Sequence, residues 1–206
     1  MGPRFRAAAL IVVFAALVSA TTAHTQSGRG GMIDPPKELP RAQTGDAKIN
    51  LDRLFEALKI APDAESAKYI EGRIWALWFA SGSDTATLLM GRVKTATDAR
   101  DTDLALKLLN AVIDIKPDFL EAYNRRATLY FMKKDYGPAL ADIRQVLARE
   151  PRHFGALSGL GIIFQELGDD KRALEAFRRA TAIHPHLERI PDLVKKLSEK
   201  VDGRDI

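Results

Sequence analysis

Three prolines at equal distances constrain the fold of this chain more than any other feature of its sequence. Pro117, Pro151 and Pro185 follow one another at intervals of 34 residues. Between them the apolar residues recur at helical spacing, and no segment alternates apolar and polar residues as a half-buried strand would. A period of this length accommodates two helices and their turns. From Leu51 onward, the sequence therefore predicts an all-α domain made of repeated helix pairs.

Each unit of this period repeats a pattern of small, aromatic and aliphatic residues. The small residues stand where paired helices would cross, so that the backbones can approach while aromatic side chains fill the flanking space. The first unit keeps the pattern mainly in its second helix and is degenerate. The recurring residues are Leu89, Val93, Ala105, Leu109 and Val112 in the first unit, Tyr123, Ala127, Tyr130, Ala139, Ile143 and Val146 in the second, and Leu157, Gly161, Phe164, Ala173, Phe177 and Ala180 in the third.

With this period, the pattern resembles the tetratricopeptide repeat (TPR) family. The resemblance covers residues 86–187 as three repeats, 86–119, 120–153 and 154–187. It implies a right-handed superhelical stack of antiparallel helix hairpins, whose first helices line a concave face that binds peptides or helices of partner proteins. Because a single hairpin leaves an apolar side open, such a stack also needs modified ends.

Residues 49–85 and 188–206 are predicted to be the capping helices at the two ends. Trp75 and Phe79 widen the apolar surface of the N-terminal pair, and we expect them to be buried against the first repeat. A partner site at this surface is the alternative. The last helix begins at Pro191 and has one apolar and one charged side, which is typical of the end of a solenoid. A partner-binding helix is the alternative there.

Residues 1–23 have the order of a secretory signal peptide, with two arginines before the apolar run of residues 7–20. The run is shorter than the roughly 20 residues that a membrane-spanning helix needs, so an uncleaved anchor is the less favoured alternative. Cleavage after Ala20 or after Ala23 fits the small-residue rule. Residues 24–48 are rich in Gly and Pro and are predicted to be a flexible linker. We expect an exported protein, periplasmic or secreted, that does not span the membrane after cleavage.

The charge balance and the absence of cysteine exclude several classes of function. The chain has 31 Lys and Arg against 27 Asp and Glu, and the leader accounts for two of the basic residues, Arg4 and Arg6. The mature protein is therefore close to neutral, whereas a nucleic-acid binder normally carries a clear basic excess. Without cysteine there is no disulfide and no thiol chemistry, which is compatible with a helical protein of a bacterial periplasm.

The residues that could carry chemistry do not form a catalytic or metal-binding pattern. The chain has four histidines, His24, His153, His184 and His186. Three of them stand in repeat turns without a placed carboxylate, so we expect exposed polar turn residues rather than metal ligands. Gly155, Gly159 and Gly161 lack the spacing of a phosphate-binding loop. Helix crossing explains only Gly161. We therefore predict a non-catalytic protein without metal or cofactor.

Arg126 departs from the family pattern, in which a Leu is usual at this position. In many members of the family an Arg here faces an acidic residue of the second helix, and Asp142 stands at the matching position. The resemblance therefore implies that Arg126 and Asp142 form a structural pair. Some members hold a terminal carboxylate with Lys and Asn side chains at fixed positions, and this clamp is absent here. The corresponding positions are Met90, Arg125, Gly155 and Gly159.

The resemblance also places a partner-binding groove along the first helices of the repeats. One residue round each helix from the buried positions lies a second stripe at the same spacing. Asn124 is expected to hydrogen-bond an extended peptide backbone, and Lys94 to meet an acidic group. The alternative is that these are ordinary solvated or half-buried helix positions. The nine groove residues are Met90, Lys94, Thr97, Asn124, Thr128, Phe131, Ser158, Ile162 and Gln165.

Together these observations predict a protein-protein interaction module that binds a peptide or helix of a partner in the groove. The alternative is a structural, self-associating component of an envelope assembly. Neither the identity of the partner nor the oligomeric state follows from the sequence, since repeats of this kind serve many unrelated complexes.

Overall fold

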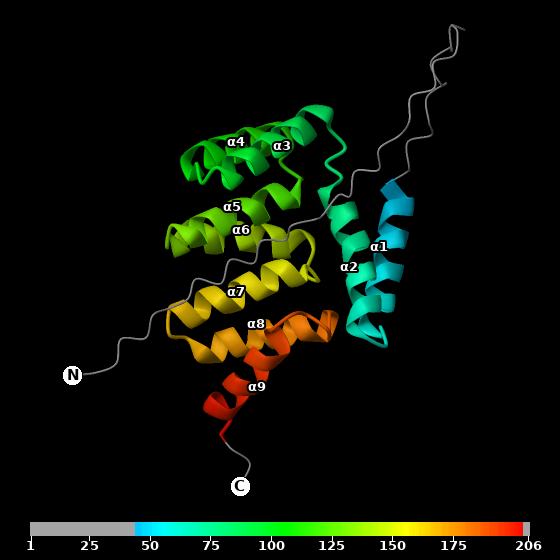
Figure 1. Cartoon of the computed structure of the whole chain (residues 1–206), viewed down its shortest axis with the longest axis vertical. Helices are drawn as coiled ribbons and strands as arrows, with labels where there is room; N and C mark the ends of the chain where they lie inside the picture. Colours follow the sequence, from blue (N-terminus) through cyan, green and yellow to red (C-terminus); the bar gives the residue numbers. More distant parts are fainter. Residues whose placement is uncertain (1–43, 204–206) are drawn as a thin grey trace, which may run out of the picture. The chain divides into compact units, whose positions relative to one another are not determined.

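The computed structural model describes residues 44–203, and the predicted signal peptide and most of the predicted linker lie outside this part of the chain. The first helix begins at Thr44, five residues before the predicted boundary at residue 49. Asp46 and Ala47 suit a first helical turn, which explains the earlier start. The described helices are α1 (Thr44–Lys59), α2 (Ala64–Phe79), α3 (Asp84–Asp98), α4 (Thr102–Ile115), α5 (Leu120–Met132), α6 (Tyr136–Arg149), α7 (Phe154–Glu166), α8 (Asp170–Ile183) and α9 (Ile190–Val201) (Figure 1).

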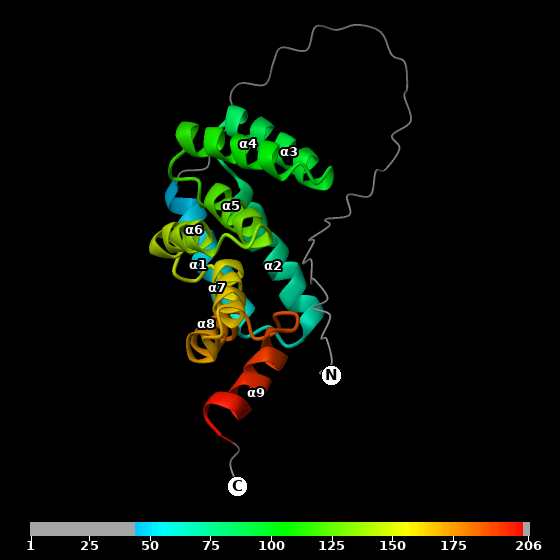
Figure 2. The ribbon, with the colours of Figure 1, turned by 90° about the vertical axis from the view of Figure 1, so that its left-hand side faces the viewer.

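Three helix hairpins, α3–α4, α5–α6 and α7–α8, stack one after another, as Figures 1 and 2 both show. The first helix of each hairpin packs beside its second helix, and the second also contacts the first helix of the next hairpin. The predicted all-α fold class with paired, stacked hairpins is confirmed. The three equally spaced prolines lie in the connections after α4, α6 and α8, where a residue without a backbone N–H does not interrupt a helix.

Close helix crossing depends on residues without a large side chain. Ala127, Ala139 and Ala173 are buried where the paired helices meet. A methyl group added at Gly161 would collide with the ring of Phe177. The Phe177 ring therefore fills the space that Gly161 leaves, and α7 and α8 approach at this point.

The N-terminal hairpin α1–α2 does not stack on the first repeat. Its buried residues, such as Leu58 and Ile74, pack with Phe154 of the third repeat, and its helices contact α8 and α5. Trp75 lies 5.5 Å from the ring of Phe154 between centroids, and Phe79 is still 39% exposed. The prediction that Trp75 and Phe79 are buried against the first repeat is therefore wrong. The hairpin instead covers the turns before and after the third repeat.

Gly155 permits this placement of the hairpin. A methyl group at Gly155 would lie 2.9 Å from the edge of the Trp75 ring. Because glycine leaves this space open at the start of α7, the indole of α2 can pack directly on the backbone of the third repeat. This long-range contact accounts for a glycine that the repeat pattern alone does not explain.

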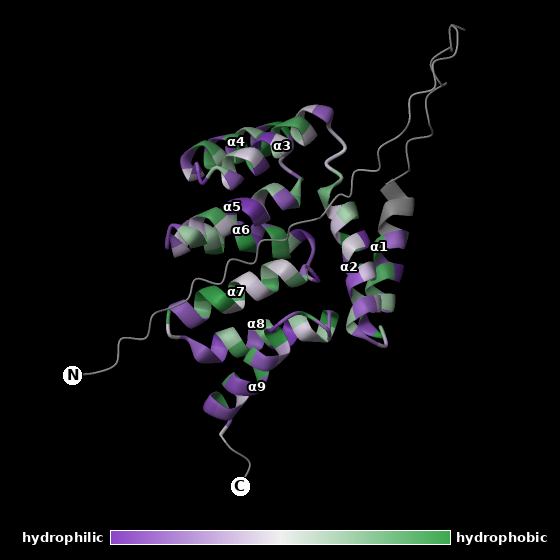
Figure 3. Cartoon of the chain, in the orientation of Figure 1, coloured by the Kyte–Doolittle hydropathy of each residue, from purple (hydrophilic) through white to green (hydrophobic). Residues whose placement is uncertain are grey.

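At the other end of the stack, α9 packs on the last hairpin. Ile190 and Leu197 are buried together with Leu174 and Phe177 of α8, and the charged residues of α9 are exposed. Figure 3 shows that hydrophilic residues make up much of α9. The C-terminal end of the stack is thus covered by a helix with a polar outer side. No helix among residues 44–203 is long and apolar enough to cross a membrane.

Substitution of two glycines of α7 tests whether α7 and α8 approach closely at Gly161. Gly161→Ala should lower the free energy of unfolding by about 1–3 kcal/mol, because its methyl group collides with Phe177. Gly159→Ala is the matched control, since its methyl group would meet Ile143 at an ordinary distance of 3.8 Å. This variant should be neutral or more stable by up to about 1 kcal/mol, because alanine favours the helix. Urea unfolding followed by circular dichroism measures both, and equal losses in the two variants would contradict the packing described.

Candidate functional site

The structure places the nine groove residues on one side of α3, α5 and α7, the first helices of the three repeats. Because these helices stack, equivalent positions follow one another from repeat to repeat. Lys94, Thr97 and Thr128 are exposed, and the other six are half-buried. None of the nine is fully buried, so all are accessible along the face of the stack.

The three apolar groove residues are partly buried against the core of the protein. Met90 packs against the core of the first repeat, Phe131 against that of the second and Ile162 against that of the third. Each is held in place by its own repeat while part of its surface remains exposed. The row therefore offers three anchored apolar contacts, one in each repeat.

The polar groove residues are partly engaged within the chain. The hydroxyls of Thr97, Thr128 and Ser158 donate to carbonyls of their own helices at 2.8, 3.0 and 2.8 Å. Lys94 forms an exposed ion pair with Asp98 at 2.6 Å. Such pairs contribute little to stability, so Lys94 can exchange this partner for another at little cost.

Asn124 keeps a hydrogen-bond acceptor for a partner. Its Nδ2 donates to Oε2 of Glu121 at 3.3 Å, which orients the amide. Its Oδ1 accepts no hydrogen bond from the described residues. A half-buried, oriented amide with a free acceptor suits recognition of a peptide N–H group.

Arg125 is a candidate binding residue that was not among the nine predicted groove positions. Its guanidinium carbon lies 4.7 Å from the ring centroid of Phe79, on the C-terminal end of α2. The Nε atom is buried, and within the described chain it has no hydrogen-bond acceptor. Burial lowers the pKa of Arg125, and the charge of Glu121 partly opposes this effect. The site thus holds a partly desolvated cation beside the groove residue Asn124.

The sequence signal for Arg125 was only its position in the repeat. Its environment depends on Phe79, which belongs to another hairpin and was predicted to pack elsewhere. Phe79 is stacked on Trp75 with centroids 5.6 Å apart. Because α2 lies beside α5 (Figure 2), these two rings border the first helices of the second and third repeats.

Two of the three turn histidines, His153 and His184, are buried, so the prediction that they are exposed is wrong, while His186 is half-buried. Nδ1 of His153 accepts the backbone N–H of Ala156 at 3.0 Å. Nε2 must therefore carry the proton that is donated to Glu121 at 2.7 Å. The ring is neutral in this arrangement, and it joins the second repeat to the third.

Aromatic side chains of the N-terminal hairpin cover this buried hydrogen bond. The Trp78 ring stacks on His153 with centroids 4.0 Å apart and planes inclined by 6°. His184 lies 3.3 Å from Glu71, and His186 donates to the carbonyl of Ala61 at 2.9 Å. The histidines thus attach α1–α2 to the repeats. No group of three or more acidic or histidine side chains that could hold a metal occurs in residues 44–203.

The structure brings Arg126 and Asp142 together. The Arg126 Nε and Nη2 atoms donate to the two carboxylate oxygens at 2.8 and 2.7 Å. Nη1 donates to Asn110 of the first repeat at 2.7 Å. The two hydrogen bonds from Arg126 to Asp142 raise the pKa of Arg126. The arginine therefore links both helices of its own hairpin to the preceding one, and its donors are used within the fold.

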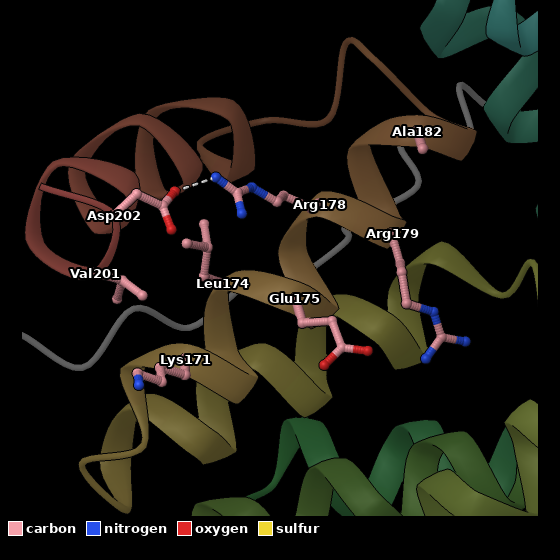
Figure 4. Close-up of a pocket in the computed structure, with 8 residues that line it drawn as sticks. All are labelled: Lys171, Leu174, Glu175, Arg178, Arg179, Ala182, Val201 and Asp202. Atoms are coloured by element: carbon pink, nitrogen blue, oxygen red, sulfur yellow. Dashed lines mark hydrogen bonds and ion pairs between the residues drawn. The ribbon is translucent and has the colours of Figure 1, made fainter. Parts of the chain in front are cut away.

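A shallow hollow of about 630 Å³ lies between α8 and the end of α9 (Figure 4). Arg178 at its rim donates to Asp202 and to Ser198, so its charge is neutralised within the protein. Lys171, Glu175 and Arg179 point from α8 around its edge. The charges are mixed and do not converge on a common point, so this hollow does not have the arrangement of an active site.

A stack of helix hairpins with an accessible row of side chains along its first helices defines a helical-repeat protein. The tetratricopeptide-repeat family pattern matches residues 135–188. A TPR repeat-containing protein of Rhizobium etli (strain CFN 42) is 39% identical over 163 residues, which cover 79% of this chain and 80% of that protein. The chain belongs to the TPR repeat-containing proteins. No catalytic domain is identified by these likenesses, and the family is generally non-catalytic.

More distant proteins share parts of the chain. Protein bimA of Emericella nidulans is 30% identical over 86 residues, which are 42% of this chain and 11% of that protein. The first TPR of Spaghetti (RPAP3) bound to an HSP90 peptide covers 58% of this chain and 95% of its own, at 20% identity and a TM-score of 0.55. The crystal structure of MamA covers 78% of this chain and 82% of its own, at 20% identity and a TM-score of 0.53. These structural likenesses show a shared fold.

The pair of Arg126 and Asp142 can be tested with the residues of the third repeat, which has Leu160 and Ala176 at the equivalent positions. Asp142→Ala should cost about 2–3 kcal/mol, because it leaves a half-buried guanidinium without its carboxylate. The double variant Arg126→Leu with Asp142→Ala should recover to within about 1 kcal/mol of the native protein, since both charges are removed. Thermal and urea unfolding measure the three proteins. A double variant less stable than Asp142→Ala would refute the compensation.

Proposed function

We propose that this chain is a non-catalytic protein-protein interaction module of the cell envelope that binds an extended segment or helix of a partner protein in the groove of the repeats. Membership of the TPR family supports protein binding, since such repeats typically mediate it. The order of residues 1–23, with a basic start and a short apolar run, supports export.

The observation that carries the groove assignment is the position of Arg125 beside the nine groove residues. Burial of the Arg125 guanidinium is costly because no carboxylate of the described chain hydrogen-bonds it, and a carboxylate of a bound segment would compensate its charge at the accessible part of the guanidinium. The Phe79 ring holds the guanidinium from one side, so that the arginine loses little further freedom on binding. An acidic side chain or terminus of the partner therefore binds at Arg125.

The neighbouring groove residues suit the rest of such a segment. The amide of Asn124 hydrogen-bonds the backbone of the segment, while Phe131 and Ile162 contact its apolar side chains. Lys94 provides a second, exposed positive charge in the first repeat. The ligand is thus a segment that combines acidic and apolar residues, and the partner binds without a chemical reaction.

Replacing Asn124 and Phe131 together by Ala should abolish partner capture and leave helicity unchanged, because both side chains are accessible on the face of the stack. The protein is immobilised as its native host produces it, and proteins retained from an envelope extract are identified by mass spectrometry. Circular dichroism checks the fold. If the double variant retains the same proteins as the native chain, the groove assignment is wrong.

Arg125→Gln should weaken binding of a captured partner by about tenfold or more, because a charge-assisted hydrogen bond is lost. Arg179→Gln is the matched control, since Arg179 is exposed on α8 and lies outside the groove. Titration calorimetry with the captured partner gives the two dissociation constants at low and high salt. Equal affinities of both variants at low salt would remove Arg125 from the binding site.

A further inference from the structure

The second helix of the first repeat carries an apolar row on the side that faces away from the second repeat. The side toward the second repeat is marked by Asn110, which accepts from Arg126 of α5, and by Ile113, which packs with the core of α5–α6. At 100° per residue, the apolar row lies on the opposite side of α4. The row consists of Leu104, Leu108, Ala111 and Ile115.

This row is unusual among the three repeats. Leu104 is 45% and Ile115 48% exposed, although both are large aliphatic residues. Only the first repeat has apolar residues at all four positions, whereas the other two place charged or polar side chains among them. The equivalent residues are Pro138, Asp142, Gln145 and Arg149 in the second repeat, and Arg172, Ala176, Arg179 and Ile183 in the third.

The first helix of this repeat, α3, also exposes an apolar residue at the end of the stack that precedes the first repeat. Leu88 is 69% exposed, whereas Ala122 and Ala156 at the equivalent positions are buried against the preceding repeat. The hairpin α1–α2, which precedes this end in the sequence, packs instead on the second and third repeats. In residues 44–203, no element covers the outer side of α3 and α4 at this end of the stack (Figures 1 and 3).

We propose that a second copy of this chain docks on this end, with its α4 antiparallel to α4 of the first copy about a two-fold axis. The four apolar residues are spaced by four, three and four positions, which is the spacing of a coiled-coil seam. This order reads the same in both directions. An antiparallel pair therefore places Leu104 against Ile115 of the second copy, and Leu108 against Ala111 of the second copy.

Charge complementarity favours a second copy over an unrelated helix. Lys107 and Asp114 flank the apolar row, are exposed, and form no ion pair with another residue of the described chain. In an antiparallel seam the residues at these flanking positions face each other across the axis. Lys107 of each copy then meets Asp114 of the other, and the two-fold axis provides this pair twice. The surface is its own complement in charge and in the spacing of its apolar residues.

The seam involves neither the groove residues nor Arg125, so the inference is independent of the proposed function. A seam of one helix from each copy, extended by Leu88, is smaller than the standard interface of stable complexes. The dimer is therefore concentration-dependent.

Sedimentation equilibrium of the protein as its native host produces it should show a monomer-dimer equilibrium. Leu104→Glu with Ile115→Glu should make the protein monomeric over the whole concentration range, with an unchanged circular dichroism spectrum, because both positions are exposed. A native chain that remains monomeric at its solubility limit would overturn the proposal. So would cross-links in a monomer between Lys107 and residues before Thr44, because the chain's own N-terminal segment would then cover the face.

A charge exchange tests the two-fold geometry without altering the apolar row. Lys107→Asp and Asp114→Lys should each weaken self-association by about tenfold or more, since like charges then face each other twice. Mixed together, these two variants should form a heterodimer about as tight as the native dimer, because every pair is complementary again. The double exchange Lys107→Asp with Asp114→Lys should also restore it. If neither the mixture nor the double exchange recovers association, the antiparallel seam is wrong.

Discussion

The structure depends on one constraint, which is that a helix hairpin buries only one of its two apolar sides by itself. Each repeat must therefore obtain its second contact from a neighbour. The close crossing of Gly161 and Phe177 buries the first apolar side within one hairpin, and the buried hydrogen bond from His153 to Glu121 joins one repeat to the next. The row of nine predicted groove residues follows from the same constraint, because stacking aligns equivalent side chains of successive first helices.

The periodic part of the fold could be predicted from the sequence because its contacts are local. Prolines, small residues and aromatic residues recur within one repeat length, and they determine which helices pair. The contact of Arg126 with Asp142 lies within a single hairpin and follows from its position in the repeat. The nine groove residues could be located for the same reason, since their positions on the first helices follow from helical periodicity. Their role in binding remains a prediction.

The position of the N-terminal hairpin could not be predicted, because it rests on contacts between residues far apart in the sequence. Trp75 packs over Gly155, and Trp78 stacks on His153. Each of these residues has an ordinary local explanation: an apolar helix face, a turn or a helix start. Only the folded chain shows that they meet. The same is true of Arg125, whose unusual environment is created by Phe79. Periodicity thus predicts the scaffold, while the non-repeated segments determine how the groove is bordered.

The two ends of the stack differ, and this difference limits what self-association can produce. At the C-terminal end α9 buries Ile190 and Leu197 against the last repeat and presents charged residues outward. At the other end the apolar residues of α4 are exposed. If both ends were open, copies could add head to tail and form an unlimited filament. With one end covered, association through the open end uses the same surface on both copies. A two-fold contact of this kind ends at two chains, and it uses none of the nine predicted groove residues.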